Sequence, residues 1–230
     1  MTEQPRHGRR DVIKVNQVCG VREARWVRGA DILGVCLGDG GRTVTAEGFR
    51  EIRRAVSAPL ALSVDASAGV SDADLPGLVR SLGPDYYEFT PPDPEKAEAF
   101  EARLALVRRV GLPGIANGFF LLEDEVSLVR SAPHLDRLAA AGVRYFQVEA
   151  DSLLGPRGTI SAGSRRLAAD LFGRYPFLVN DRFGHLDSPL DVQQSGLYLN
   201  IGGRGVRNYD LSERSYALPA AVRLLRSAGR

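Results

Sequence analysis

Residues 13–35 read IKVNQVCGVREARWVRGADILGV and contain two apolar runs separated by a short polar segment. The runs belong to DVIKVNQV at 11–18 and ADILGVCL at 30–37, which are rich in the residues that strands favour. The segment between them, REARWVRG, allows only about two turns of helix. A strand, a short helix and a second strand in this order predict two parallel neighbours joined by a crossover.

The same unit recurs along the whole chain. Apolar residues at spacings of three and four mark amphipathic helices between further apolar runs. Eight units of about 25 residues predict an α/β fold, a single (β/α)8 TIM barrel, with short helices after its first and seventh strands. The further strand candidates are 59–66, 85–90, 113–119, 145–151, 176–181 and 196–202, and the helix candidates include 46–56, 72–82, 94–110, 164–172 and 213–228.

An open, doubly wound sheet is the alternative to a closed barrel. That fold usually carries a glycine-rich dinucleotide turn after its first strand, and VNQVCGV is not such a turn. The length of 230 residues suits one barrel and shows no second domain. We therefore expect a flexible polar tail at 1–10 and a single barrel domain at 11–230.

Composition excludes several classes of protein. Thirty basic residues against 28 acidic ones give a net charge of +2, which does not favour a nucleic-acid partner. No window reaches the run of about 18 apolar residues that a membrane span needs, and the first ten residues lack the apolar core of a secretion signal. Cys19 and Cys36 show neither disulfide nor zinc spacing. We expect a cytoplasmic monomer or homodimer without nucleic-acid or membrane partners.

Polar residues recur at the carboxyl ends of the predicted strands, on one face of the two-residue alternation. Lys14 and Asn16 share a face of the first strand, and Gln147 shares one with Glu149 and Asp151 on the sixth. Active sites of these barrels lie at this end, and charged groups are seldom placed inside unless paired or used. We therefore predict an acid–base site at this rim. Its other members are Ser63, Asp65, Glu88, Asn117, Asn180, Asp181 and Asn200.

The loop after the eighth strand, NIGGRGVRNYD at 200–210, resembles an anion-binding turn. Gly202, Gly203 and Gly205 would let backbone N–H groups approach an anion, and Arg204 would add positive charge. Phosphate sites of such barrels lie in the loops after the seventh and eighth strands. The turn predicts an anionic or phosphorylated small-molecule substrate, with a solvated surface turn as the alternative.

Several of these segments resemble phosphoribosylanthranilate isomerase, a barrel enzyme of tryptophan biosynthesis, over about residues 12–212. GADILGV at 29–35 is similar to the family's second strand, and RTVTAE at 42–47 to the segment after it. FQVEAD at 146–151 is similar to the sixth strand, and LNIGGRGV at 199–206 to the final anion loop. The resemblance implies that Arg42 positions the substrate and that Glu149 takes the place of the catalytic aspartate.

The first strand departs from the family at the catalytic base. Aligning Lys14 with the family's motif lysine places Asn16 where the catalytic cysteine stands, and an amide has no usable proton affinity. Cys19 is three residues further along and would face the other way, so we expect it to be a small apolar residue at the start of a short helix. A lysine beside Glu149 would form an ion pair. The candidate catalytic residues are Glu149, Asp151, Lys14, Asp65 and Glu88.

Three functions stay open. The first is a repurposed barrel enzyme for a metal-independent isomerisation, cyclisation or lyase step in a specialised biosynthetic pathway. The second is an Amadori-type isomerase on a phosphorylated sugar-amine, and the third is a non-catalytic ligand-binding barrel. No cofactor and no metal is predicted, although Asp65, Glu88, Glu149 and Asp181 could converge as oxygen ligands in a metal-dependent variant. The candidate substrate-binding residues are Asn16, Arg42, Asn117, Asn180, Asp181, Asn200, Gly202, Gly203, Arg204 and Gly205.

Overall fold

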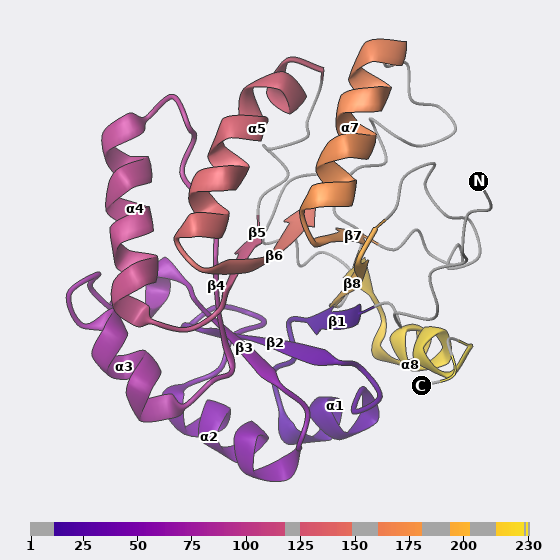
Figure 1. Ribbon diagram of the computed structural model, residues 1–230. Helices are drawn as coiled ribbons and strands as arrows, with labels where there is room; N and C mark the ends of the chain where they lie inside the picture. Colours follow the sequence, from indigo (N-terminus) through magenta and orange to yellow (C-terminus); the bar gives the residue numbers. More distant parts are fainter. Residues whose placement is uncertain are drawn as a thin grey trace.

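The strands form a closed, parallel barrel (Figure 1). The computed structural model describes residues 12–117, 125–148, 161–180, 194–202, 215–227 and 229. Each strand pairs with the next along the chain, and β1 also pairs with β8, so the predicted (β/α)8 barrel is confirmed. The strands are β1 (Val12–Asn16), β2 (Ile32–Leu37), β3 (Leu60–Val64), β4 (Tyr86–Phe89), β5 (Gly114–Asn117), β6 (Val143–Val148), β7 (Phe177–Asn180) and β8 (Gly196–Ile201).

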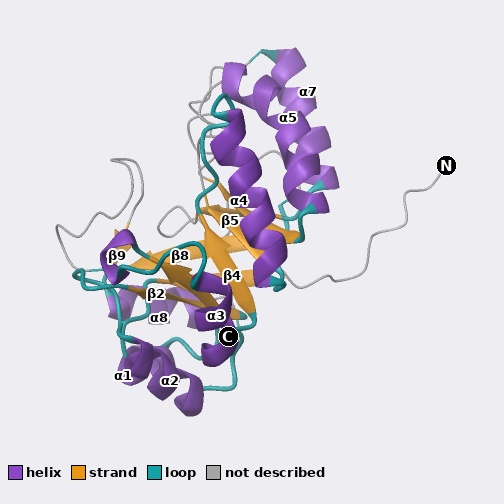
Figure 2. Cartoon of the chain, turned by 90° about the vertical axis from the view of Figure 1, so that its left-hand side faces the viewer, coloured by secondary structure: helices purple, strands orange, loops and turns teal. Residues whose placement is uncertain are grey.

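Helices surround the strands, with α1 to α3 on one side and α4, α5 and α7 on the other (Figure 2). The short helix expected after the first strand is α1, with six residues. The segment after the seventh strand and the tail at 1–10 lie outside the described residues. The helices are α1 (Val21–Trp26), α2 (Ala46–Ala55), the 3-10 helix η1 (Ala66–Ala68), α3 (Leu75–Leu82), α4 (Ala97–Val110), α5 (Glu125–Ala140), α7 (Ala162–Arg174) and α8 (Leu218–Ser227).

Two segments differ from the sequence-based expectation. The predicted helix at 213–228 is wrong at its start, because Ser215–Tyr216 form a short strand, β9, which pairs with β8. Helix α8 begins only at Leu218, with Pro219 in its first turn, where proline costs no hydrogen bond. The second segment is helix α5, for which no bounds were predicted although the repeating unit requires a helix there. It contains Pro133 in its interior, and proline is ordinarily a signal that a helix ends.

The alternation of the strands separates two apolar regions. Outward-facing residues such as Val15, Leu33 and Phe146 join the main core beneath the helices. A second, smaller cluster of Ile32, Ala61 and Ile115 lies apart from that core. The strand registers place its members on the same face as Lys14, because Lys14 pairs with Ile32. The barrel interior is therefore apolar toward the amino ends of the strands, and its polar residues lie nearer their carboxyl ends. None of the helices in the described ranges has the length and apolar character needed to cross a membrane.

Tyr175, at the end of α7, connects two outer helices and predicts a pH dependence of stability. Its hydroxyl donates to the Asp136 carboxylate of α5. Burial, and then this hydrogen bond, raise the pKa of Tyr175 to about 12 from an ordinary value of 10. The phenol therefore loses its proton at lower pH in the unfolded chain than in the folded one. The stabilisation is complete below pH 10 and is lost as the pH rises to 12.

We expect the free energy of unfolding to fall by roughly 2 kcal/mol more in the wild type than in Tyr175→Phe across this pH window. Phenylalanine keeps the ring packing of Tyr175 against Phe146 but has no proton to lose. Urea denaturation at several pH values up to about 12 measures the difference. If the free energy of unfolding fell equally with pH in the two proteins, the ionisation of this hydroxyl would not be coupled to folding.

Candidate functional site

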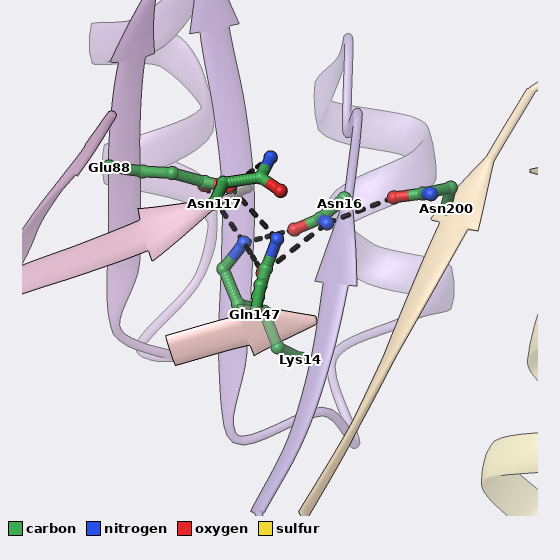
Figure 3. A network of polar contacts seen from close by, with 6 residues as sticks. All are labelled: Lys14, Asn16, Glu88, Asn117, Gln147 and Asn200. Atoms are coloured by element: carbon green, nitrogen blue, oxygen red, sulfur yellow. Dashed lines mark hydrogen bonds and ion pairs between the residues drawn. The ribbon is translucent and has the colours of Figure 1, made fainter. Parts of the chain in front are cut away.

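Lys14 lies at the centre of the barrel, with 0% of its surface exposed. Its ammonium group donates to Glu88 Oε2 at 2.8 Å and to Gln147 Oε1 at 2.6 Å, and it also donates to Asn16 Oδ1. The contact with Glu88 is a buried ion pair between β1 and β4 (Figure 3). Removing two charges from water is costly, so such a pair requires further hydrogen bonds around it.

Amide side chains supply those hydrogen bonds. The second oxygen of Glu88, Oε1, accepts from Gln147 Nε2 at 3.2 Å and from Asn117 Nδ2 at 3.3 Å. Asn16 Nδ2 donates to Asn200 Oδ1 at 2.9 Å. Because an ammonium can only donate, its contacts fix which amide atoms of Asn16 and Gln147 face Lys14. The polar network is thus one connected, oriented unit of Lys14, Asn16, Glu88, Asn117, Gln147 and Asn200.

The network lies where barrel enzymes bind their substrates. Asn16 and Asn117 are the last residues of β1 and β5, and Glu88, Gln147 and Asn200 are next to last in β4, β6 and β8. Active sites of this fold lie at the carboxyl ends of the strands. The predicted gathering of polar groups at this end is therefore present, and it draws on five strands.

Gly34 of β2 provides the space for the network. A Cβ atom at this position would lie 2.7 Å from Asn16 Oδ1 and 3.1 Å from Lys14 Nζ. Both distances are shorter than normal van der Waals contact, so a side chain here would displace the polar groups. The absence of a side chain at residue 34 is thus part of how the network fits inside the barrel.

Two predicted site residues have other partners. Asp65 is exposed, and its carboxylate accepts from Ser67 N at 2.9 Å as the N-cap of η1. Hydrogen bonding to the Ser67 side chain, and then to this backbone N–H, lowers the pKa of Asp65. Arg42 donates to Gln17 O at 2.7 Å and to Glu23 Oε2 at 2.6 Å. Neither residue contacts the polar network through a described hydrogen bond. Arg42 instead holds the connection between β1 and α1.

Cys19 lies in that same connection, just before α1. Its thiol donates to Glu23 Oε2 at 3.3 Å, and its side chain packs against the main core beneath the helices. Burial, and then the bond to Glu23, raise the pKa of the Cys19 thiol, which keeps it protonated at neutral pH. Its placement agrees with the expected small apolar residue at the start of a short helix.

Other predicted residues divide into two groups. Asn180 is buried at the end of β7, and its Nδ2 finds no hydrogen-bond partner within the described ranges, while Gly202 is half-buried after β8. Lys14 pairs with Glu88, and the expected pair of Lys14 with Glu149 stays a prediction because Glu149 lies outside the described residues. The residues of the second group lie outside the described part of the chain: Glu149, Asp151, Asp181, Gly203, Arg204 and Gly205.

Gln147 was predicted to lie at the rim but was not named as a catalytic or substrate-binding candidate, although it is central to the network. The signal for it was the alternation along 145–151, which places Gln147 on the same face as Glu149. Glu149 was named as a candidate in place of Gln147 because a carboxylate can take up or release a proton and a neutral amide cannot. Within the described ranges, no group of three or more His, Cys, Asp or Glu side chains is close enough to hold a metal ion.

The closed parallel barrel and its buried polar network define the chain as a (β/α)8 barrel with a candidate site at the carboxyl ends of its strands. Its fold is that of the phosphoribosylanthranilate isomerases. The enzyme from Thermotoga maritima matches with a TM-score of 0.63 at 10% identity, over 95% of this chain and 98% of that one. The enzyme from Pyrococcus furiosus matches with a TM-score of 0.61 at 13% identity, over 94% and 99%.

A third such enzyme was solved in complex with reduced 1-(o-carboxyphenylamino)-1-deoxyribulose 5-phosphate. It matches with a TM-score of 0.62 at 12% identity, over 95% of this chain and 98% of that one. No protein-family model and no curated protein sequence matches the chain. The sequence resemblance is therefore confirmed as a likeness of fold across nearly the whole chain.

Proposed function

We propose that the chain is a barrel enzyme that transfers a proton within a small anionic substrate, in an isomerisation, cyclisation or lyase step. The observation that carries this proposal is the buried Lys14–Glu88 ion pair, set in amide groups at the carboxyl ends of the strands. Layers inside such barrels are usually filled by branched apolar residues. An ion pair in a core is seldom needed for stability, because apolar residues of similar volume often replace it without loss. Its location at the carboxyl ends of the strands supports a chemical role.

Glu88 is the proposed general base. Its carboxylate is held by Lys14 on one oxygen and by Asn117 and Gln147 on the other, so its position is fixed before a substrate arrives. A positioned base of this kind contributes about 10²–10⁴-fold to a proton transfer. The known donations of Lys14 go to Asn16, Glu88 and Gln147, which makes it a positioning residue for the base. We propose Glu149 or Asp151 as the matching acid.

The Amadori rearrangement is the second candidate. The likeness in fold to an isomerase bound to a phosphorylated sugar-amine analogue supports a phosphorylated small-molecule substrate. However, Asn16 stands where the family resemblance places the cysteine base, and its amide is engaged by Lys14 and Asn200. A carboxylate base on β4 in place of a thiol on β1 supports a different proton transfer.

Expression of the chain in a tryptophan auxotroph that lacks phosphoribosylanthranilate isomerase is expected to give no growth without tryptophan. The reason is that the amide of Asn16 cannot remove a proton. The isomerase from Thermotoga maritima, expressed from the same vector, should restore growth. Immunoblotting of the soluble fraction shows that the chain accumulates. Growth at the rate of the control strain would assign the chain to the Amadori reaction and contradict the proposal.

A further inference from the structure

The surface between α1 and α8, on the outside of the barrel, carries charge that the candidate site does not use. A cavity of about 620 Å³ lies there, and Arg25, Arg28, Arg223 and Arg226 line it. All four arginines are exposed. We call this cavity the α1–α8 groove. Its volume falls within the range of roughly 300–1,000 Å³ that is typical of small-molecule sites.

Among the residues that the structure describes, no carboxylate is paired with the arginines of the α1–α8 groove. Helix α8 contains no acidic residue, and the one acidic residue of α1, Glu23, is paired with Arg42. No salt bridge joins any of the four arginines to another described residue. The groove therefore brings four guanidinium groups together without a described counter-charge.

The α1–α8 groove also has an apolar wall. Trp26 lies in its lining with 48% of its surface exposed, and Pro219 and Val222 of α8 line it as well. The guanidinium group of Arg22 lies over the Trp26 ring, 5.1 Å from its centroid. Burying a tryptophan contributes strongly to binding, and its ring stacks well on flat heterocycles. The groove thus combines a ring-binding surface with several guanidinium groups.

We infer that the α1–α8 groove binds a phosphorylated small molecule that carries a flat ring, of the nucleoside diphosphate class. Guanidinium groups recognise phosphate oxygens in pairs of parallel hydrogen bonds, and four of them can neutralise a diphosphate. The ring packs on Trp26. The size of the cavity favours a single nucleotide over a polynucleotide. This site is separate from the barrel interior, and the inference does not depend on the proposed proton transfer.

Trp26 is the only tryptophan in the chain, so its fluorescence reports directly on the groove. The experiment titrates the full-length protein with ADP and, separately, with inorganic pyrophosphate, exciting where ADP does not absorb. We expect a saturable change with ADP and binding of pyrophosphate that is at least about tenfold weaker, because the ring contact is missing. We expect Arg25→Gln/Arg223→Gln to weaken ADP binding by about tenfold or more.

The matched control is Arg80→Gln/Arg108→Gln, which removes two exposed arginines from α3 and α4. It should leave ADP binding unchanged. The inference is overturned by the absence of a saturable signal at millimolar ADP, by equal binding of ADP and pyrophosphate, or by equal losses in the two double variants. Binding of a single-stranded oligonucleotide without binding of ADP would also overturn it, in favour of a nucleic-acid surface.

Discussion

Replacing Lys14 by methionine is expected to lower the free energy of unfolding by about 3–5 kcal/mol. The change leaves the Glu88 carboxylate buried without its cation, and it removes the donor that Asn16 Oδ1 and Gln147 Oε1 share. The double variant Lys14→Met/Glu88→Gln removes both charges and keeps an amide that Asn117 and Gln147 can contact. We expect it to be more stable than Lys14→Met. Urea denaturation at neutral pH measures both values.

The control for this comparison is Arg54→Met, which breaks the exposed ion pair between Arg54 and Glu47. Exposed pairs contribute little, so its cost should stay below about 1 kcal/mol. The single variant Glu88→Gln completes the cycle. If the double variant instead lost the sum of the losses of Lys14→Met and Glu88→Gln, Lys14 and Glu88 would not be coupled. The ion pair would then contribute no coupling free energy, and Lys14 would not be the residue that positions Glu88.

Gly196→Ala is expected to cost about 3 kcal/mol or more, because it prevents the normal closure of the barrel. A Cβ atom at this position would lie 2.0 Å from Val12 O, and it would also clash with Val12 C and N at 2.8 Å. These are backbone atoms of β1, so no side-chain rotation can relieve the overlap. Gly196 and Val12 are register partners in the pairing of β8 with β1 that closes the sheet.

Gly77→Ala, in helix α3, is the matched control for Gly196→Ala. Nothing lies within 4 Å of a Cβ atom at this position. Alanine favours a helix by up to about 1 kcal/mol over glycine, so this variant should be neutral or more stable. Urea denaturation of both variants gives the comparison. Equal stabilities would show that β1 and β8 do not approach as closely as the structure places them.

The fold could be predicted from the sequence because its signals are local. Alternation within single strands placed Lys14, Asn16 and Gln147 on inward faces, and the structure brings these residues together. The ion pair between Lys14 and Glu88 could not be predicted in the same way. Glu88 is 74 residues further along the chain, and the stagger of the barrel strands decides which inward residues meet.

The partners of Asp65 and Arg42 could not be predicted from strand alternation either. Alternation continued the inward face of β3 to Asp65, but the strand ends at Val64 and the carboxylate caps η1. Short acidic side chains often bond to nearby backbone N–H groups in this way. The guanidinium group of Arg42 forms an ion pair with Glu23, which lies 19 residues earlier in the sequence. The anion-binding turn, the oligomeric state and the cytoplasmic location stay predictions, as do the roles of Glu149, Asp151 and Asp181.

We propose that the polar network is an acid–base centre, and a proton-exchange measurement is the most direct test of this role. Wild-type protein and Lys14→Met/Glu88→Gln are incubated in D₂O with phosphorylated aldoses, phosphorylated ketoses and their arylamine adducts. Proton NMR follows deuterium incorporation beside the carbonyl or imine carbon. We predict that the wild type accelerates exchange in at least one compound by about 10²-fold or more and that the folded double variant does not. Equal exchange with both proteins across every compound would show that the polar network is not an acid–base centre.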